Sequence, residues 1–115
     1  MYNIEMLADE NALVGEGPVW DVNPETLYWT DIQNGRFFNY NPTTGVNKTI
    51  HQGVNTGGVA INRSGGLIVG TWEGVQFWNS DDDFTWIKKD TFEDKKIKTN
   101  DVTSAPDGSF LVGTA

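Results

Sequence analysis

The chain repeats one pattern three times, and this repeat most constrains the fold. The repeated segments read "GPVWDVNPETLYWTD" from Gly17, "GGVAINRSGGLIVGT" from Gly57 and "NDVTSAPDGSFLVGT" from Asn100. They align without gaps, at offsets of 40 and 43 residues. In each segment a valine opens one strand, a polar turn follows, and an apolar residue opens the next strand. The valines are Val19, Val59 and Val102, and the apolar residues are Leu27, Leu67 and Phe110.

A hairpin unit that recurs about every 40–45 residues is typical of a β-propeller, whose blades have four strands each. The stretches after the first two hairpins supply the outer strands: "GRFFNYN" and "VNKTIH", then "GVQFWN" and "FTWIKK". We therefore expect an all-β propeller with blade units that start near residues 16, 56 and 99. An ordinary β-sandwich with similar hairpins is the alternative.

The 115 residues hold roughly two and a half such units, whereas propellers close with about 4–8 blades. We expect residues 1–115 to be the N-terminal part of a single propeller domain. Remaining blades or partner chains would close the ring, because bare strand edges invite aggregation.

The early segment "YNIEML" is expected to be an outer strand that pairs with the last blade. The best helical candidate, "DTFEDKKIK", is expected to be a loop with one turn of helix.

The composition excludes several classes of function. Sixteen acidic residues stand against eight basic ones, so nucleic acid is a poor partner. The absence of cysteine excludes a disulfide scaffold and thiolate metal sites. No apolar run approaches the roughly 18 residues of a membrane span, and no signal peptide is recognised, so we expect no membrane partner and a cytoplasmic location.

The aligned units differ at the positions that lead into the first strand of each. Glu16 stands where the other units have Thr56 and Thr99, and Asn100 and Asp101 follow in the third unit. In a propeller this strand is the innermost, so these positions are expected to converge at the mouth of the central channel. Carboxylate and amide oxygens suit Ca²⁺, Mg²⁺ or Mn²⁺, and a carboxylate can also hold Zn²⁺. An exposed carboxylate in a turn is the alternative for Glu16.

Other candidate motifs indicate structure rather than chemistry. His51 is the only histidine, so no Ser-His-Asp set can be built, and we expect it on a surface strand. The aspartates at 81–83 lack the glycine and the distal glutamate of an EF-hand and are expected at a hairpin tip. Four tryptophans are expected to pack between blades: Trp29, Trp72, Trp78 and Trp86.

Several of these stretches together resemble the start of the SMP-30/gluconolactonase/LRE family, which includes regucalcin. The matching residues are "GEGPVWD", "LYWTDI", "NRSGGLIVGT", "KTND" and "PDGSFLVGT", in this order over nearly the whole chain. The resemblance implies a six-bladed propeller that hydrolyses sugar lactones with one divalent metal ion. Ca²⁺ is the first candidate for that ion, and Zn²⁺, Mg²⁺ and Mn²⁺ are alternatives.

The resemblance also implies roles for individual residues. Glu16 corresponds to a metal ligand at the channel mouth. Lys98 and Asn100 correspond to the substrate contacts of an Arg-x-Asn-Asp motif, although lysine replaces the arginine here. The other ligands, an Asn and an Asp, are expected in later blades, with that Asp as the general base. No catalytic residue is therefore expected within this chain.

Two other readings stay open at this point. "LYWTDI" also resembles the YWTD propellers of receptor ectodomains, which bind proteins without chemistry, but the tetrapeptide does not recur in the second and third units. A non-catalytic, calcium-binding, regucalcin-like role is a related alternative. The chain by itself is expected to be inactive, whatever the longer protein does.

Overall fold

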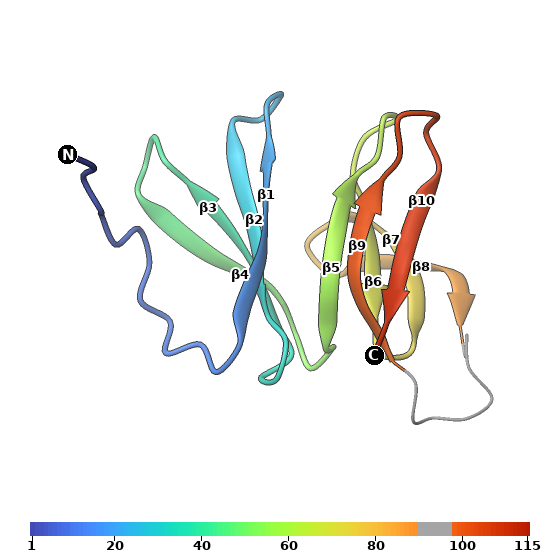
Figure 1. Cartoon of the computed structure of the whole chain (residues 1–115). Coiled ribbons are helices and arrows are strands. Elements are labelled where there is room, and N and C mark those ends of the chain that lie inside the picture. Colours follow the sequence, from blue (N-terminus) through green and yellow to red (C-terminus); the bar gives the residue numbers. More distant parts are fainter. Residues whose placement is uncertain (90–97) are drawn as a thin grey trace.

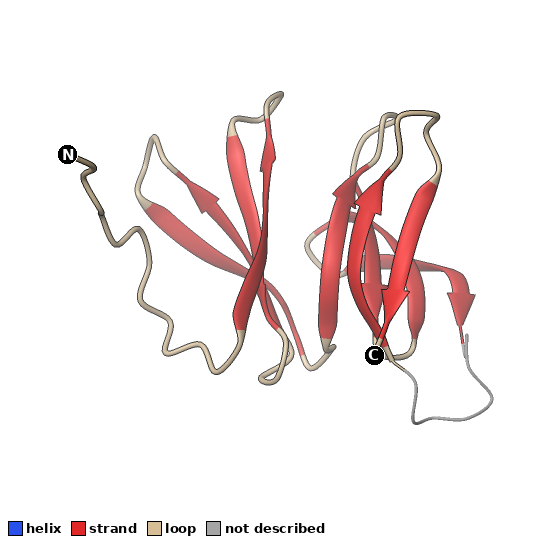
Figure 2. Ribbon diagram, in the orientation of Figure 1, coloured by secondary structure: helices blue, strands red, loops and turns tan. Residues whose placement is uncertain are grey.

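All regular elements that the structure describes are β-strands (Figure 2). A computed structural model describes residues 1–89 and 98–115. The expected loop with a helical turn falls on residues 90–98, of which only Lys98 lies within the described residues. Nothing in the described part is a helix long and apolar enough to cross a membrane. The all-β prediction is confirmed.

Within residues 1–89 and 98–115, ten strands form three antiparallel sheets, which correspond to two blades and the hairpin of a third. Blade 1 has the strand order β1-β2-β3-β4, blade 2 has β5-β6-β7-β8, and blade 3 has β9 paired with β10. The bounds are β1 (Gly15–Asp21), β2 (Thr26–Asp31), β3 (Arg36–Asn41), β4 (Val46–Gln52), β5 (Thr56–Ile61), β6 (Leu67–Thr71), β7 (Gly74–Ser80), β8 (Asp83–Lys89), β9 (Thr99–Ser104) and β10 (Phe110–Thr114).

The register corrects the ungapped alignment of the repeats by one residue. In blade 1 the last pair before the turn is Asp21 with Thr26, whereas in blade 2 it is Ile61 with Leu67. The first turn is therefore one residue shorter, and β2 begins at Thr26 rather than at Leu27. Thr26 and Leu67 are accordingly the equivalent inward-facing residues, and both are buried.

Blades 1 and 2 pack face to face through a hydrophobic core. Trp78 of β7 reaches across to blade 1, where its ring lies edge-on to Tyr28 and Phe37 at centroid distances of 5.7 and 5.9 Å. The prediction that Trp78 packs between blades is confirmed. Burial of these side chains provides most of the force that holds the two sheets together. The whole cluster comprises Tyr28, Phe37, Ile50, Val59, Leu67, Val69 and Trp78.

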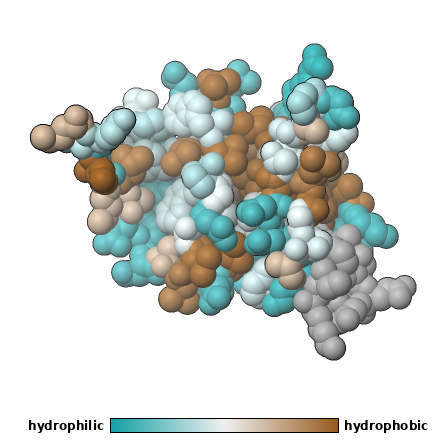
Figure 3. Space-filling view, viewed as in Figure 1, coloured by the Kyte–Doolittle hydropathy of each residue, from teal (hydrophilic) through white to brown (hydrophobic). Residues whose placement is uncertain are grey.

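The innermost strands β1, β5 and β9 all begin at the same end of the sheets, which is the lower end in Figure 1. We call this end the rim. Strand β5 lies between the other two, as in neighbouring blades of a propeller. On the outside, apolar patches alternate with hydrophilic ones (Figure 3), and Leu13, Trp20 and Leu111 are among the exposed apolar side chains.

The N-terminal segment takes a different form from the one expected. Residues 1–12 form no strand, and the blade expected to pair with "YNIEML" is not within these 115 residues. The segment instead returns to blade 1, where Asn47 Nδ2 donates to Glu10 Oε1 at 3.0 Å and Arg36 Nη2 donates to the Glu10 carbonyl at 2.7 Å. These contacts hold the chain that leads into β1.

Candidate metal and substrate site

Strand register places one residue of each blade at an equivalent rim position. Glu16 pairs with Thr30, Thr56 with Thr71, and Thr99 with Thr114. The threonines at 56 and 99 are almost fully buried, with 1% of their surface exposed, while Glu16 is partly exposed. Glu16 is therefore the residue at which blade 1 departs from the repeated scaffold.

The backbones of the innermost strands lie very close together at the rim. A Cβ atom on Gly57 would meet the carbonyl oxygen of Asn100 at 2.5 Å, and one on Gly17 would lie 3.9 Å from the Gly57 oxygen. The equivalent positions 17, 57 and 100 thus form a row across three blades. Glu16 and Asn100 therefore lie at the same rim, although no described hydrogen bond or ion pair joins their side chains.

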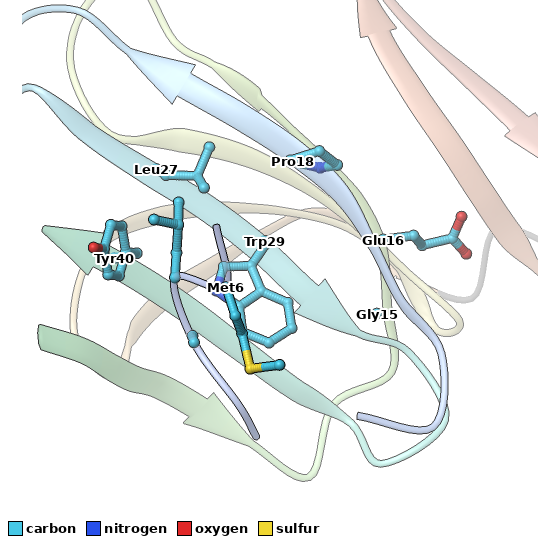
Figure 4. Close-up of a pocket in the computed structure, with 9 residues that line it drawn as sticks. Met6, Gly15, Glu16, Pro18, Leu27, Trp29 and Tyr40 are labelled. Carbon is cyan, nitrogen blue, oxygen red and sulfur yellow. The ribbon is translucent and has the colours of Figure 1, made fainter. Parts of the chain in front are cut away.

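A bulge follows Glu16 in β1, and the innermost strands of the other two blades have the same bulge after Thr56 and Thr99. The pairing of β1 with β2 shifts between Glu16 and Val19, where Gly17 has a φ of 63° and Pro18 has no N–H to donate. Such bulges redirect a side chain beside a site. Glu16 is among the residues that line the hollow beside Trp29, but its carboxylate points away from that hollow (Figure 4). That hollow is lined by the apolar side chains of Met6, Leu27, Trp29 and Tyr40, among others.

Lys98 and Asn100 lie at the start of blade 3. The backbone of Lys98 pairs with Ala115 in both directions, at 3.0 and 2.9 Å. Its ammonium nitrogen lies 3.4 Å from the centroid of the Trp72 ring, which is a cation–π contact. Asn100, the second residue of β9, is partly exposed. Lys98 is thus fixed at both its backbone and its charged end.

Two features of the rim were not found from the sequence. One is the contact of Trp72 with the Lys98 ammonium, which joins the end of β6 to the start of blade 3. The other is a pair of threonine hydroxyls that tie neighbouring blades: Thr30 Oγ1 donates to the Thr56 carbonyl at 2.7 Å, and Thr99 Oγ1 donates to the Thr71 carbonyl. The threonines that recur at the rim, at the start of β5 and β9 and near the end of β2, β6 and β10, were the available signal for the second feature.

A buried acidic residue, Asp31, lies on β2 next to Thr30, the residue that pairs with Glu16. Asp31, at the end of β2, is 0% exposed and forms an ion pair with Arg36 at 2.8 Å. Burial by itself would raise the pKa of this carboxyl. Hydrogen bonds from the N–H groups of Val14 and Leu13, and from Arg36 and Asn34, outweigh burial and lower the pKa from 3.8 to about 2. Asp31 is therefore ionised throughout the physiological range.

The donor atoms at the rim fit a hard cation only in part. Glu16 offers a carboxylate and Asn100 an amide oxygen, both of the kind that Ca²⁺ and Mg²⁺ prefer. Among residues 1–89 and 98–115, no cluster of three or more His, Cys, Asp or Glu could hold a metal ion. Since Ca²⁺ takes about 6–8 oxygens, a site at this rim would need further ligands from outside this chain.

The chain is similar in sequence to a protein named as a lactonase and to a regucalcin. It is 32% identical over 111 residues to pentonolactonase XacC of Haloferax volcanii and 30% identical over 112 residues to regucalcin of Xenopus laevis. Each match covers 96% of this chain and 38% of the relative. The chain therefore spans little more than a third of the length of these curated relatives.

A solved structure and a family model agree with these matches. A calcium-binding protein, regucalcin, from Agrobacterium tumefaciens superposes with a TM-score of 0.80 at 18% identity, over 90% of this chain and 35% of that one. This similarity confirms the fold. The family model described as the SMP-30/Gluconolactonase/LRE-like region matches residues 14–115, which is nearly the whole chain. The chain belongs to the SMP-30/gluconolactonase/LRE-like family.

Proposed function

We propose that the full-length protein is a metal-dependent sugar lactonase of which this chain supplies one metal ligand and part of the substrate site. The observation that carries the proposal is the position of Glu16. It stands where the other blades have a buried threonine, and its carboxylate points away from the apolar hollow (Figure 4). Relatives named as lactonases at about 30% identity support the reaction class.

The residues of this chain would act by binding and orienting. A divalent ion held by Glu16 would polarise the lactone carbonyl and make a bound water more acidic. Asn100 can donate to and accept from sugar hydroxyls at once. Lys98, steadied over Trp72, would present a positive charge to an oxygen-rich or anionic group of the substrate. The base that deprotonates the water is expected in the remaining blades.

Chelation tests the metal dependence. Lactone hydrolysis by the full-length protein, followed as acid release, should fall to background with EDTA and return when Ca²⁺, Mg²⁺, Mn²⁺ or Zn²⁺ is added. The ion that restores activity at the lowest concentration identifies the preferred metal. Activity that persists after exhaustive chelation would refute the metal role.

A calcium-binding role without catalysis is the second candidate, since the structural neighbour is described as a calcium-binding protein. Under that reading the full-length protein would bind Ca²⁺ but hydrolyse none of a panel of aldonolactones. We also propose that the 115-residue chain is inactive alone, because it carries one carboxylate of the expected ligand set. Measurable turnover by the isolated chain would contradict that.

A further inference from the structure

Asp31 is a fully buried carboxylate that the proposed chemistry does not use. Its Oδ1 accepts hydrogen bonds from the N–H groups of Leu13 and Val14, at 3.2 and 3.0 Å. Its Oδ2 accepts from Asn34 Nδ2 at 2.7 Å and from Arg36 Nη2 at 2.8 Å. Charge-assisted hydrogen bonds of this kind are about twice as strong as neutral ones, so Asp31 holds its partners firmly.

The two N–H groups that Asp31 holds belong to the residues just before β1. Strand β1 then pairs regularly for two residues, Gly15 with Asp31 and Glu16 with Thr30, before the register shifts. Beyond Glu16 the next residues are those of the bulge, and Pro18 has no N–H to donate to the sheet. Regular pairing thus supports Glu16 on its N-terminal side alone. On that side the Ile32 N–H donates to the Val14 carbonyl at 3.0 Å, and Asp31 holds the Leu13 and Val14 N–H groups.

The other two blades have the same bulge after the rim threonine but lack the carboxylate. The counterparts of Asp31 after the rim threonine of the second strand are Trp72 and Ala115, which pair with Asn55 and Lys98 through backbone atoms. Neither carries a carboxylate. In those blades the rim residue is a buried threonine that needs no aiming. The carboxylate clamp therefore occurs in the blade that presents a charged residue at the rim.

We propose that Asp31 is a positioning residue for Glu16. By holding the Leu13 and Val14 N–H groups, it fixes the start of β1 and keeps the Glu16 carboxylate at the rim, ready for a divalent cation. This inference rests on the proposed metal site. A preformed ligand loses less conformational freedom on binding, and residues that orient a metal ligand typically change metal affinity about 10–100-fold.

Calorimetric titration of Ca²⁺ into the metal-free, full-length protein tests the proposal. Asp31→Asn should raise the Kd about tenfold or more. The same change should weaken binding little when Glu16→Gln is already present, because no charged ligand is left to position. Hydrogen exchange of the peptide that contains Leu13 and Val14, measured by mass spectrometry, should become faster and show directly that the clamp has opened.

Asp21→Asn is the matched control, since Asp21 lies at the other end of β1 and its Oδ1 only accepts from the Asn23 N–H at 3.1 Å. It should leave the Kd unchanged. Should Asp31→Asn fail to fold, Asn34→Ala removes one donor to Oδ2 from an exposed residue and should raise the Kd about two- to threefold.

The possible outcomes separate this inference from the proposed function. Faster exchange with an unchanged Kd in Asp31→Asn or Asn34→Ala would overturn the inference alone. The inference would also be overturned if both the Kd and the exchange rate of Asp31→Asn stayed at the wild-type values. Absence of Ca²⁺ binding by the wild-type protein, with chelator-resistant lactone hydrolysis, would refute the metal site and the inference with it.

Discussion

Removal of the Asp31 charge should destabilise the protein by an amount that depends on pH. The pKa of this carboxyl falls from 3.8 to about 2 on folding, which corresponds to about 2.4 kcal/mol of stabilisation. Asparagine keeps an acceptor for the Leu13 and Val14 N–H groups but leaves Arg36, whose side chain is only 19% exposed, without its negatively charged partner. Asp31→Asn should therefore lower the free energy of unfolding at pH 7 by about 2 kcal/mol.

The sign of the pH dependence distinguishes this charge effect from a loss of packing. Because the folded pKa lies below the unfolded one, the stabilisation is fully present above about pH 4 and is lost as pH falls through about 2. Urea denaturation of the wild type and of Asp31→Asn should show a difference that shrinks between pH 4 and pH 2. A difference that stays constant over this range would refute the electrostatic account, and Asp21→Asn provides the control at each pH.

Three further changes test the packing of the blades. Phe37→Ala should cost about 3–5 kcal/mol in denaturation, because Phe37 is 0% exposed between blades 1 and 2; a cost below 1 kcal/mol would contradict that core. Thr30→Val keeps the shape of the side chain but leaves the Thr56 carbonyl without its hydroxyl donor, so it should lower the free energy of unfolding by about 1–3 kcal/mol. An unchanged free energy of unfolding would show that this hydrogen bond does not stabilise the contact between the blades. Gly57→Ala should cost about 1–3 kcal/mol, because its Cβ would press on the Asn100 backbone, and unchanged thermal unfolding would show that the innermost strands can separate.

Much of the fold could be predicted because β-hairpins are local. Alternating apolar residues and polar turns located the strands, and the spacing of the valines gave the blade period. The one-residue difference between the first turn and the others was missed, since Leu27 looked like the apolar counterpart of Leu67. Only the pairing of Thr26 across the turn reveals that a threonine takes the inward-facing position. An apolar pattern cannot show this, because that position is polar in blade 1.

The candidate site was predicted less completely because its supports join residues far apart in the sequence. Comparison of the repeats identified Glu16 and Asn100 as departures from the scaffold, and the structure brings both to the rim. The contact of Lys98 with Trp72 crosses 26 residues, and the hold of Asp31 on Leu13 spans 18. No periodicity encodes such contacts. The aspartate at the end of "LYWTD" was visible, but its burial and its backbone partners were not.

Turnover by Glu16→Gln tests the central claim most directly. Glutamine keeps the size of the side chain and removes the charge that would bind a divalent ion. Lactone hydrolysis by the full-length protein should fall at least about tenfold at the metal concentration that saturates the wild type, whereas Glu25→Gln in the exposed β1–β2 turn should hydrolyse the lactone at the wild-type rate. Wild-type turnover by Glu16→Gln would show that this carboxylate is an ordinary turn residue and that the metal site lies elsewhere.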